Sequence, residues 1–216
     1  MSLYNEFVEI LIPTELIKIA EFHSEQRTKY IKRQFSPNQD PLTHLESNYI
    51  GVLGELAARQ YLDELEIELE DNYKNNEVDF GDLGVNGLIY DVKTEAIPEE
   101  YYNLLRCGEI KPWTPYGCRV WTAKHKHYLP KYTDGLIFCA LQIPVDTKKL
   151  IKSLGIRTTL IVNQTVLIIG FVNQSSIKEK KPTWFTPKSP SGKRRKYNSE
   201  NFIFQHSEVT SIKKLI

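Results

Sequence analysis

Residues 77–95 constrain the fold of this chain most, because they predict a β-hairpin that brings acidic side chains together. Two runs containing apolar residues flank a turn rich in glycine and asparagine. If the turn lies near Val85 and Asn86, Asp79 and Asp91 lie at similar distances from its apex. We therefore expect these two carboxylates to be cross-strand neighbours, with paired Cα atoms roughly 4.5–5.5 Å apart.

The second strand of this hairpin adds a lysine to the two acids. Side chains alternate between the faces of a strand, so Ile89, Asp91 and Lys93 share one face. Two neighbouring carboxylates relieve their repulsion by sharing Mg²⁺, which takes oxygen ligands and keeps several waters. A lysine beside them can orient or help to deprotonate an attacking water, and can offset charge on a phosphate. The cluster therefore indicates metal-dependent phosphate chemistry.

A third acid lies in the preceding predicted helix, at residues 44–65. Apolar side chains leave little of this helix polar, which is typical of a buried helix. A buried glutamate such as Glu55 must be paired or must bind a cation, because an isolated buried charge is very costly. An ion pair with Arg59, one turn on, would satisfy it. Next to the hairpin we favour a metal or water role for Glu55, with Gly51 and Gly54 allowing the helix to approach the sheet closely.

These residues resemble the motif of the PD-(D/E)XK nuclease superfamily, which has the restriction-endonuclease-like fold. The family motif is an acid, a variable gap, and then an acid, any residue and a lysine. Here it corresponds to Asp79 and to Asp91-Val92-Lys93, with Val78 in place of the usual proline. The resemblance covers about residues 45–143. It implies an α/β fold with a central mixed β-sheet flanked by helices.

The resemblance also implies an activity, that of a DNA endonuclease that uses Mg²⁺, or Mn²⁺ as a substitute. Asp79, Asp91 and the Val92 carbonyl would bind the metal, and Lys93 would position the water and stabilise developing negative charge. Glu55 matches the glutamate that many members carry on a preceding helix, and would bind a second metal or a water of the first. Because one such site cuts one strand, cleavage of a duplex favours a two-fold homodimer.

The composition limits where DNA can bind. A length of 216 residues fits a single nuclease-like domain (residues 1–216, with its catalytic core at about 44–172). The formal net charge of +1 excludes a global positive field, so a contact with nucleic acid must be local. Basic residues gather at 178–196, in the C-terminal extension 173–216, with Trp184 and Phe185 among them. We expect a flexible loop there to contact DNA through four consecutive cations, Lys193, Arg194, Arg195 and Lys196.

Outside this extension, two basic segments have competing interpretations. Lys124 lies in a run that also holds two histidines, and it is a further candidate for phosphate contact or an exposed residue without a role. Arg27 and Lys29 lie near the end of a predicted helix at 14–34, where we favour a solvated helical face over a helix that contacts phosphate. The cysteines are odd in number and indicate reduced thiols in a cytoplasmic protein. No long apolar run predicts a membrane segment.

The remaining elements suit an α/β domain with a mixed sheet. The apolar run 134–143 predicts a strand buried on both faces. Other predicted strands lie at 6–12, at the sheet edge, at 118–122, within 158–172 and at 201–204, and short helices at 99–107 and 147–154.

Two other classes of function remain open. One is a DNA-binding protein that has a nuclease-like fold without activity. The other is a structural or partner-binding α/β protein in which Asp91 and Lys93 form a surface salt bridge.

Overall fold

The computed structural model describes residues 7–30, 44–67, 69–70, 82–122, 133–143 and 165–215. Its centre is a mixed β-sheet in the order β1-β7-β6-β4-β3-β2. The strands are β1 (Val8–Leu11), β2 (Leu69–Glu70), β3 (Leu83–Val85), β4 (Leu88–Pro98), β6 (Gly135–Ile143) and β7 (Thr165–Asn173). β4 and β6 run parallel, whereas the other neighbours run antiparallel. The predicted α/β class with a central mixed sheet is confirmed.

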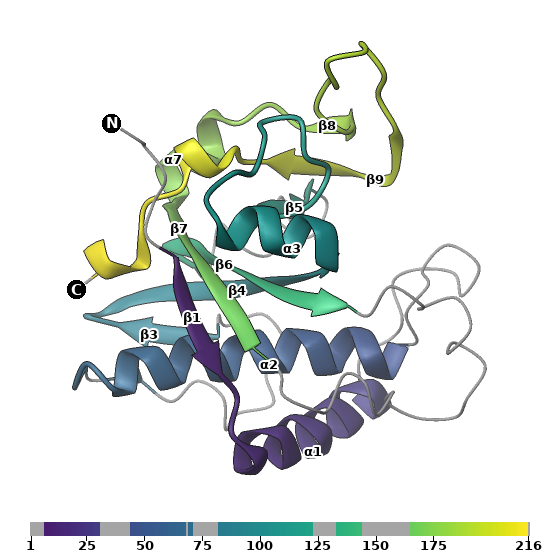
Figure 1. Cartoon of the computed structure of the whole chain (residues 1–216). Helices are drawn as coiled ribbons and strands as arrows, with labels where there is room; N and C mark the ends of the chain where they lie inside the picture. The colour runs from purple at the N-terminus through teal and green to yellow at the C-terminus, as the bar shows by residue number, and fades with distance from the viewer. Residues whose placement is uncertain are drawn as a thin grey trace.

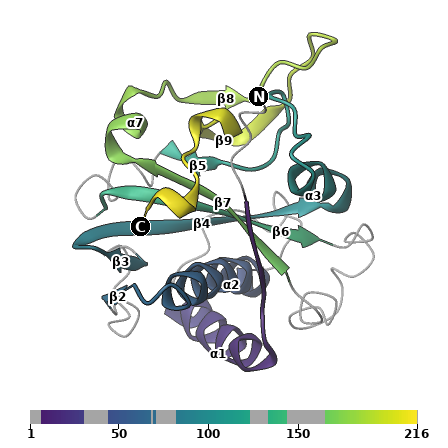
Figure 2. The same ribbon diagram turned by 60° about the vertical axis from the view of Figure 1, so that its left-hand side comes forward.

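Helices cover one face of the sheet and a second layer covers the other (Figure 1). Helices α1 (Thr14–Tyr30) and α2 (His44–Asp63) pack on the first face. Helix α3 (Glu99–Arg106) and a small antiparallel sheet lie on the second, as Figure 2 shows. Two separate groups of buried apolar residues correspond to these two faces. The central strands β4, β6 and β7 therefore contribute alternate side chains to the two cores.

Helix α2 lies close to the sheet because of one glycine. It buries residues on most of its circumference, as its pattern predicted. A Cβ atom at Gly54 would come 1.8 Å from the Thr94 Oγ1 atom of β4, whereas one at Gly51 would meet nothing within 4 Å. Gly54 therefore has the predicted role in close approach, and Gly51 does not.

The hairpin of β3 and β4 turns at Asn86 and Gly87, one residue later than the predicted apex. Both residues have positive φ, 52° and 76°, as a two-residue type I′ turn requires. The pairing runs from Val85 opposite Leu88 to Leu83 opposite Tyr90. This turn determines which acids face each other, as described below.

The small sheet is built mainly from the C-terminal extension. Its order is β5-β9-β8, with β5 at Arg119–Trp121, β8 at Thr183–Phe185 and β9 at Lys196–Ile203. A short helix, α7 (Gln174–Glu179), leads from β7 towards it. The prediction of one flexible loop at 178–196 was therefore wrong for the parts that form α7, β8 and the start of β9. Only residues 186–195 join strands as a loop.

Most other predicted elements are present. β1 lies at the edge of the sheet, α3 and β5 lie where a short helix and a strand were expected, and β6 is buried as its apolar run predicted. The predicted helix 147–154 and the first part of 158–172 lie outside the described residues. Two short 3₁₀ helices, His206–Glu208 and Ile212–Lys214, follow β9. In the described part of the chain, no helix is long and apolar enough to cross a membrane.

Candidate metal and phosphate site

The predicted site residues fall into three groups in the structure. Asp91, Val92 and Lys93 lie on β4, and Glu55 lies on α2. Lys193, Arg194 and Arg195 lie in the loop between β8 and β9 and Lys196 begins β9, in a different layer. Asp79 and Lys124 lie outside the described residues, so their predicted roles stay predictions.

Asp82, a residue that the sequence analysis did not single out, lies directly before β3 and close enough to Asp91 for the two charges to interact. The register places Leu83 opposite Tyr90, and the Asp82 N–H donates to the Tyr90 carbonyl at 2.9 Å. The Asp82 carboxylate also accepts a hydrogen bond of 2.7 Å from the Val92 N–H. Asp82 thus occupies the place in the hairpin that we predicted for Asp79.

Asp91 and Lys93 form an ion pair on the face of β4 that they were predicted to share. Asp91 is buried, at 5% exposure, and Lys93 is partly buried. Burial by itself would lower the pKa of Lys93, but the charges of Asp91 and Asp82 outweigh it and raise that pKa above its ordinary value. Lys93 is therefore protonated, as an ammonium cation, at neutral pH.

Glu55 is paired with a cation from another helix. Arg27 of α1 donates two parallel hydrogen bonds of 2.6 Å to the Glu55 carboxylate, in a bidentate pair. Glu55 is 5% exposed, so this pair supplies the charge compensation that a buried glutamate needs. The prediction that Arg27 belongs to a solvated helical face was wrong.

Asp82 is the acid of the cluster whose negative charge, when it ionises, neither nearby cation balances. Removal from water raises its pKa first, and the charges of Glu55 and Asp91 raise it further. Lys93 and Arg27 oppose these effects only in part, and the pKa of Asp82 is raised to about 8. Three carboxylates share two cations here, so the cluster has room for one more positive charge.

The cluster lies where β3 and β4 stop pairing. Beyond Tyr90, the one strand that pairs with β4 among the described residues is β6. The N–H and C=O of one strand residue point the same way. Because the Val92 N–H points to Asp82, the Val92 carbonyl faces the same edge, beside Asp82.

The chemistry of these donors fits a hard divalent cation. Asp82 and Asp91 are oxygen ligands with excess negative charge, and the Val92 carbonyl is directed to the same edge. Within the described ranges, no three His, Cys, Asp or Glu side chains are gathered in a preformed metal cage. Mg²⁺ does not require such a cage, because it binds through one or two carboxylates together with waters and substrate phosphates.

A second buried acid on the same face of β4 connects the site to the small sheet. Glu95 pairs with Arg119 of β5 at 2.6 Å and accepts a 2.7 Å hydrogen bond from the Gly117 N–H. Burial raises the pKa of Glu95 to about 7, although Arg119 and the Gly117 N–H oppose that rise. The guanidinium of Arg119 lies 5.1 Å from the ring centroid of Tyr197 in β9.

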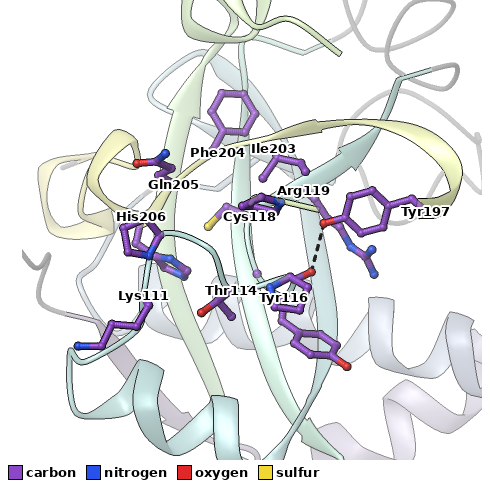
Figure 3. A pocket seen from close by; sticks show the side chains of 14 residues that line it. Lys111, Thr114, Tyr116, Cys118, Arg119, Tyr197, Ile203, Phe204, Gln205 and His206 are labelled. Atoms are coloured by element: carbon purple, nitrogen blue, oxygen red, sulfur yellow. Dashed lines mark hydrogen bonds between the residues drawn. The ribbon is translucent and has the colours of Figure 1, made fainter. Parts of the chain in front are cut away.

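A small pocket between residues 111–119 and β9 lies apart from this cluster (Figure 3). Tyr197 spans it and donates a hydrogen bond of 3.4 Å to the Pro115 carbonyl. His206 lines the pocket, and burial lowers its pKa to about 4, so it is neutral at physiological pH. None of the acids of the cluster lines this pocket. Its lining residues come from the segment 111–119 and from the small sheet, which the hydrogen bond of Tyr197 connects.

The sequence analysis missed two residues of the cluster, Asp82 and Arg27. The Asn86-Gly87 dipeptide was the available signal for Asp82, because this pair favours a type I′ turn, and a turn there brings Asp82 to the part of β4 that holds Asp91. For Arg27 we find no such signal, because it meets Glu55 across a helix interface.

We compared the chain with models of protein families, with curated proteins and with solved structures, and none of them matched.

Proposed function

We propose that this chain is a metal-dependent DNA endonuclease with a restriction-endonuclease-like core. The observation that supports it is the convergence of Asp82, Asp91 and Lys93 where β3 and β4 separate, next to Glu55 on α2. With Asp82 as the first acid, the chain still resembles the PD-(D/E)XK motif, with its two acids near each other at the base of one hairpin. The sequence and the packing therefore point to the same chemistry.

Two acids and one carbonyl would hold the metal, namely Asp82, Asp91 and Val92. A bound Mg²⁺ or Mn²⁺ supplies Lewis acidity that polarises the phosphate and lowers the pKa of a bound water. The uncompensated charge at Asp82 supports this assignment, because a cation there replaces the proton that the carboxylate otherwise holds.

Lys93 would act on the phosphate as a cation. Its raised pKa keeps the ammonium protonated, so it donates hydrogen bonds to the attacking water and to a phosphate oxygen rather than taking a proton. In the hydrolysis, the water oxygen forms a bond to phosphorus and one P–O ester bond breaks; the water gives up a proton to solvent and the leaving sugar oxygen takes one up. Negative charge grows on the phosphate oxygens during this step, and Lys93 lies beside Asp91 to offset it.

Glu55 and Arg27 would form the part of the site that comes from helices α2 and α1. The bidentate pair holds the Glu55 carboxylate in a fixed orientation near Asp82. From there Glu55 can bind a metal-bound water or a second metal ion. Release of Glu55 from Arg27 would be required for direct metal ligation.

A second candidate function has one observation in its favour. Asp91 and Glu55 each have a cation partner within the chain, as in a protein whose acids are only structural. A DNA-binding protein without nuclease activity would retain the fold and this pairing. It would not need Mg²⁺, so metal binding separates the two functions.

The decisive experiment is cleavage of supercoiled plasmid and of single-stranded DNA with Mg²⁺, Mn²⁺ or EDTA. We expect Asp82→Asn and Asp91→Asn to lose metal binding and cleavage together. Lys93→Ala should retain metal binding, measured by calorimetry, and lose cleavage by at least about a hundredfold. Asp63→Asn, at an exposed acid at the end of α2, is the matched control.

Two outcomes would refute the nuclease. One is full cleavage by Lys93→Ala, and the other is absence of metal-dependent cleavage in a folded wild-type protein that binds no Mg²⁺. Nicking and linearisation of the plasmid by wild type also report on the proposed homodimer, because linear product formed without a nicked intermediate requires two sites acting together.

A further inference from the structure

The small antiparallel sheet carries a basic segment. We define the basic arm as residues 183–203, which comprise β8, β9 and the loop 186–195 between them. No acidic residue occurs from 180 to 199, although the whole chain has a net charge of only +1. Among the described residues, Lys188, Lys193 and Arg194 have no ion-pair partner, and all three are exposed or half-buried. Their charges are therefore available to a polyanion.

The loop of the basic arm is a hydrogen-bonded hairpin rather than a free coil. The Thr186 N–H donates to the Arg195 carbonyl, and the Arg195 N–H donates to the Thr186 hydroxyl, at 2.9 and 3.0 Å. Nearer the tip, the Ser189 N–H donates to the Lys193 carbonyl at 3.0 Å. Gly192, with a φ of 77°, allows the chain to reverse there. The cations are thus presented in a fixed arrangement that projects from the body in both views (Figures 1 and 2).

Two aromatic rings on the basic arm remain in contact with solvent. Trp184 and Phe185 are 45% and 43% exposed. The Lys196 ammonium lies 5.7 Å from the Trp184 ring centroid, so a cation accompanies an exposed ring. Adjacent exposed aromatics mark contact surfaces in a soluble protein, and base stacking on an aromatic ring stabilises complexes with unpaired strands.

The basic arm lies on the face of the sheet that carries Asp91 and Lys93. Asp91, Lys93 and Glu95 alternate along β4 and share one face. On that face Glu95 binds Arg119 of β5, and β5 pairs with β9 of the basic arm. A strand held by the basic arm therefore approaches the sheet from the side of the catalytic acid and lysine.

We propose that the basic arm binds a single-stranded segment of DNA. Phosphates contact Lys193, Arg194 and Arg195, and an unpaired base stacks on Trp184. The proposal deepens the proposed nuclease function, on which it rests for the choice of DNA, by naming a substrate with unpaired bases. A duplex offers the same phosphates but keeps its bases stacked on each other, so it lacks the aromatic contact.

The test is binding in EDTA, where cleavage cannot occur. Fluorescence anisotropy is measured with a short fluorescein-labelled oligothymidylate and with a duplex of equal length, over a range of salt concentrations. We expect Trp184→Ala to weaken binding of the single strand about tenfold and binding of the duplex much less. Trp184→Phe should restore most of the loss, because it keeps an aromatic face.

The charge contribution is measured separately. Arg194→Ala combined with Arg195→Ala should reduce the slope of log affinity against log salt by about 1.4, because each phosphate contact with a single strand contributes about 0.7. Two matched controls lie on α1, on the opposite face of the sheet: Phe22→Ala for an exposed ring, and Lys18→Ala with Lys29→Ala for two exposed cations. We expect both controls to bind as wild type does.

Three results would overturn the proposal. The first is that wild type does not bind the oligothymidylate. The second is that Trp184→Ala binds the single strand as tightly as wild type does. The third is that Trp184→Ala loses affinity equally for the single strand and the duplex. Failure of the nuclease is distinguishable from these, because a protein that binds through the basic arm and cleaves nothing leaves the binding data intact.

Discussion

Asp82→Asn removes an ionisable carboxyl group from the site and leaves the size of the side chain nearly unchanged. The asparagine oxygen can still accept the 2.7 Å hydrogen bond from the Val92 N–H. The change therefore isolates the electrostatic cost that Asp82 imposes on the metal-free protein.

The sign of the expected effect follows from the pKa of Asp82. It is raised from 3.8 to about 8 on folding, so the folded protein holds a proton that the unfolded chain releases. Wild-type stability contributed by this group is therefore lost as pH rises from about 4 towards 8. Asparagine has no such dependence, so the variant should be the more stable protein, increasingly so over that pH range.

The magnitude can be worked from the same shift. At pH 7 the group lies about three pH units above its unfolded pKa, which corresponds to about 4 kcal/mol. Asp82 is half-buried, so solvent screening reduces this value, and we expect about 2 kcal/mol. For a chain of this length, that gain raises the melting temperature by about 4–8 °C.

The assay is thermal unfolding followed by circular dichroism, in EDTA and then with Mg²⁺, between pH 5 and pH 8. In EDTA, Asp82→Asn should melt at a higher temperature than wild type. The control Asp63→Asn should melt at the same temperature as wild type. Mg²⁺ should stabilise wild type and leave Asp82→Asn unchanged, since ligand binding to the folded state alone raises stability. A variant that melts at or below wild type in EDTA at pH 8 would refute the reasoning.

Two further predictions concern packing and charge away from the metal ligands. Gly54→Ala should destabilise the fold by about 1–3 kcal/mol in urea denaturation, because its Cβ would lie 1.8 Å from the Thr94 hydroxyl oxygen. Gly51→Ala should instead gain about 1 kcal/mol of helix propensity, and equal effects of the two substitutions would contradict the assigned close approach. Arg119→Ala should cost about 2 kcal/mol at pH 8 and less at pH 5, because the buried Glu95, whose pKa is already raised to about 7, loses its cation and resists ionisation. Thermal unfolding at both pH values measures this, and a pH-independent loss would show that Arg119 acts through packing alone.

Much of the hairpin could be predicted because its determinants are local. Alternation along β4 places Asp91 and Lys93 on one face, and the structure pairs them there. The acid near Asp91 depends on the position of the turn. Because the turn lies at Asn86 and Gly87, the residue that comes near Asp91 is Asp82. A shift of one residue in the apex of a hairpin moves the opposing residue by two positions, so register is sensitive to turn chemistry.

The basic arm illustrates the limit of composition. A run of cations, prolines and aromatic residues predicts a nucleic-acid contact equally well from a coil or from a hairpin. That the segment is a strand pair depends on β9 pairing with β5, which lies far away in the sequence. Composition identifies the charges, but only that long-range pairing places the basic arm on the side of the sheet that carries Asp91 and Lys93.

The sequence by itself determined the local elements: the strand carrying Asp91 and Lys93, the buried helix around Glu55 and the buried strand β6. These depend on side-chain periodicity and turn preferences over a few residues. The tertiary structure alone decided that Arg27 meets Glu55, that Arg119 meets Glu95, and that Asp82 is left with charge that neither cation balances. These contacts join residues far apart in the chain, and their free energies depend on burial and on neighbouring charges that exist only when the whole fold is assembled.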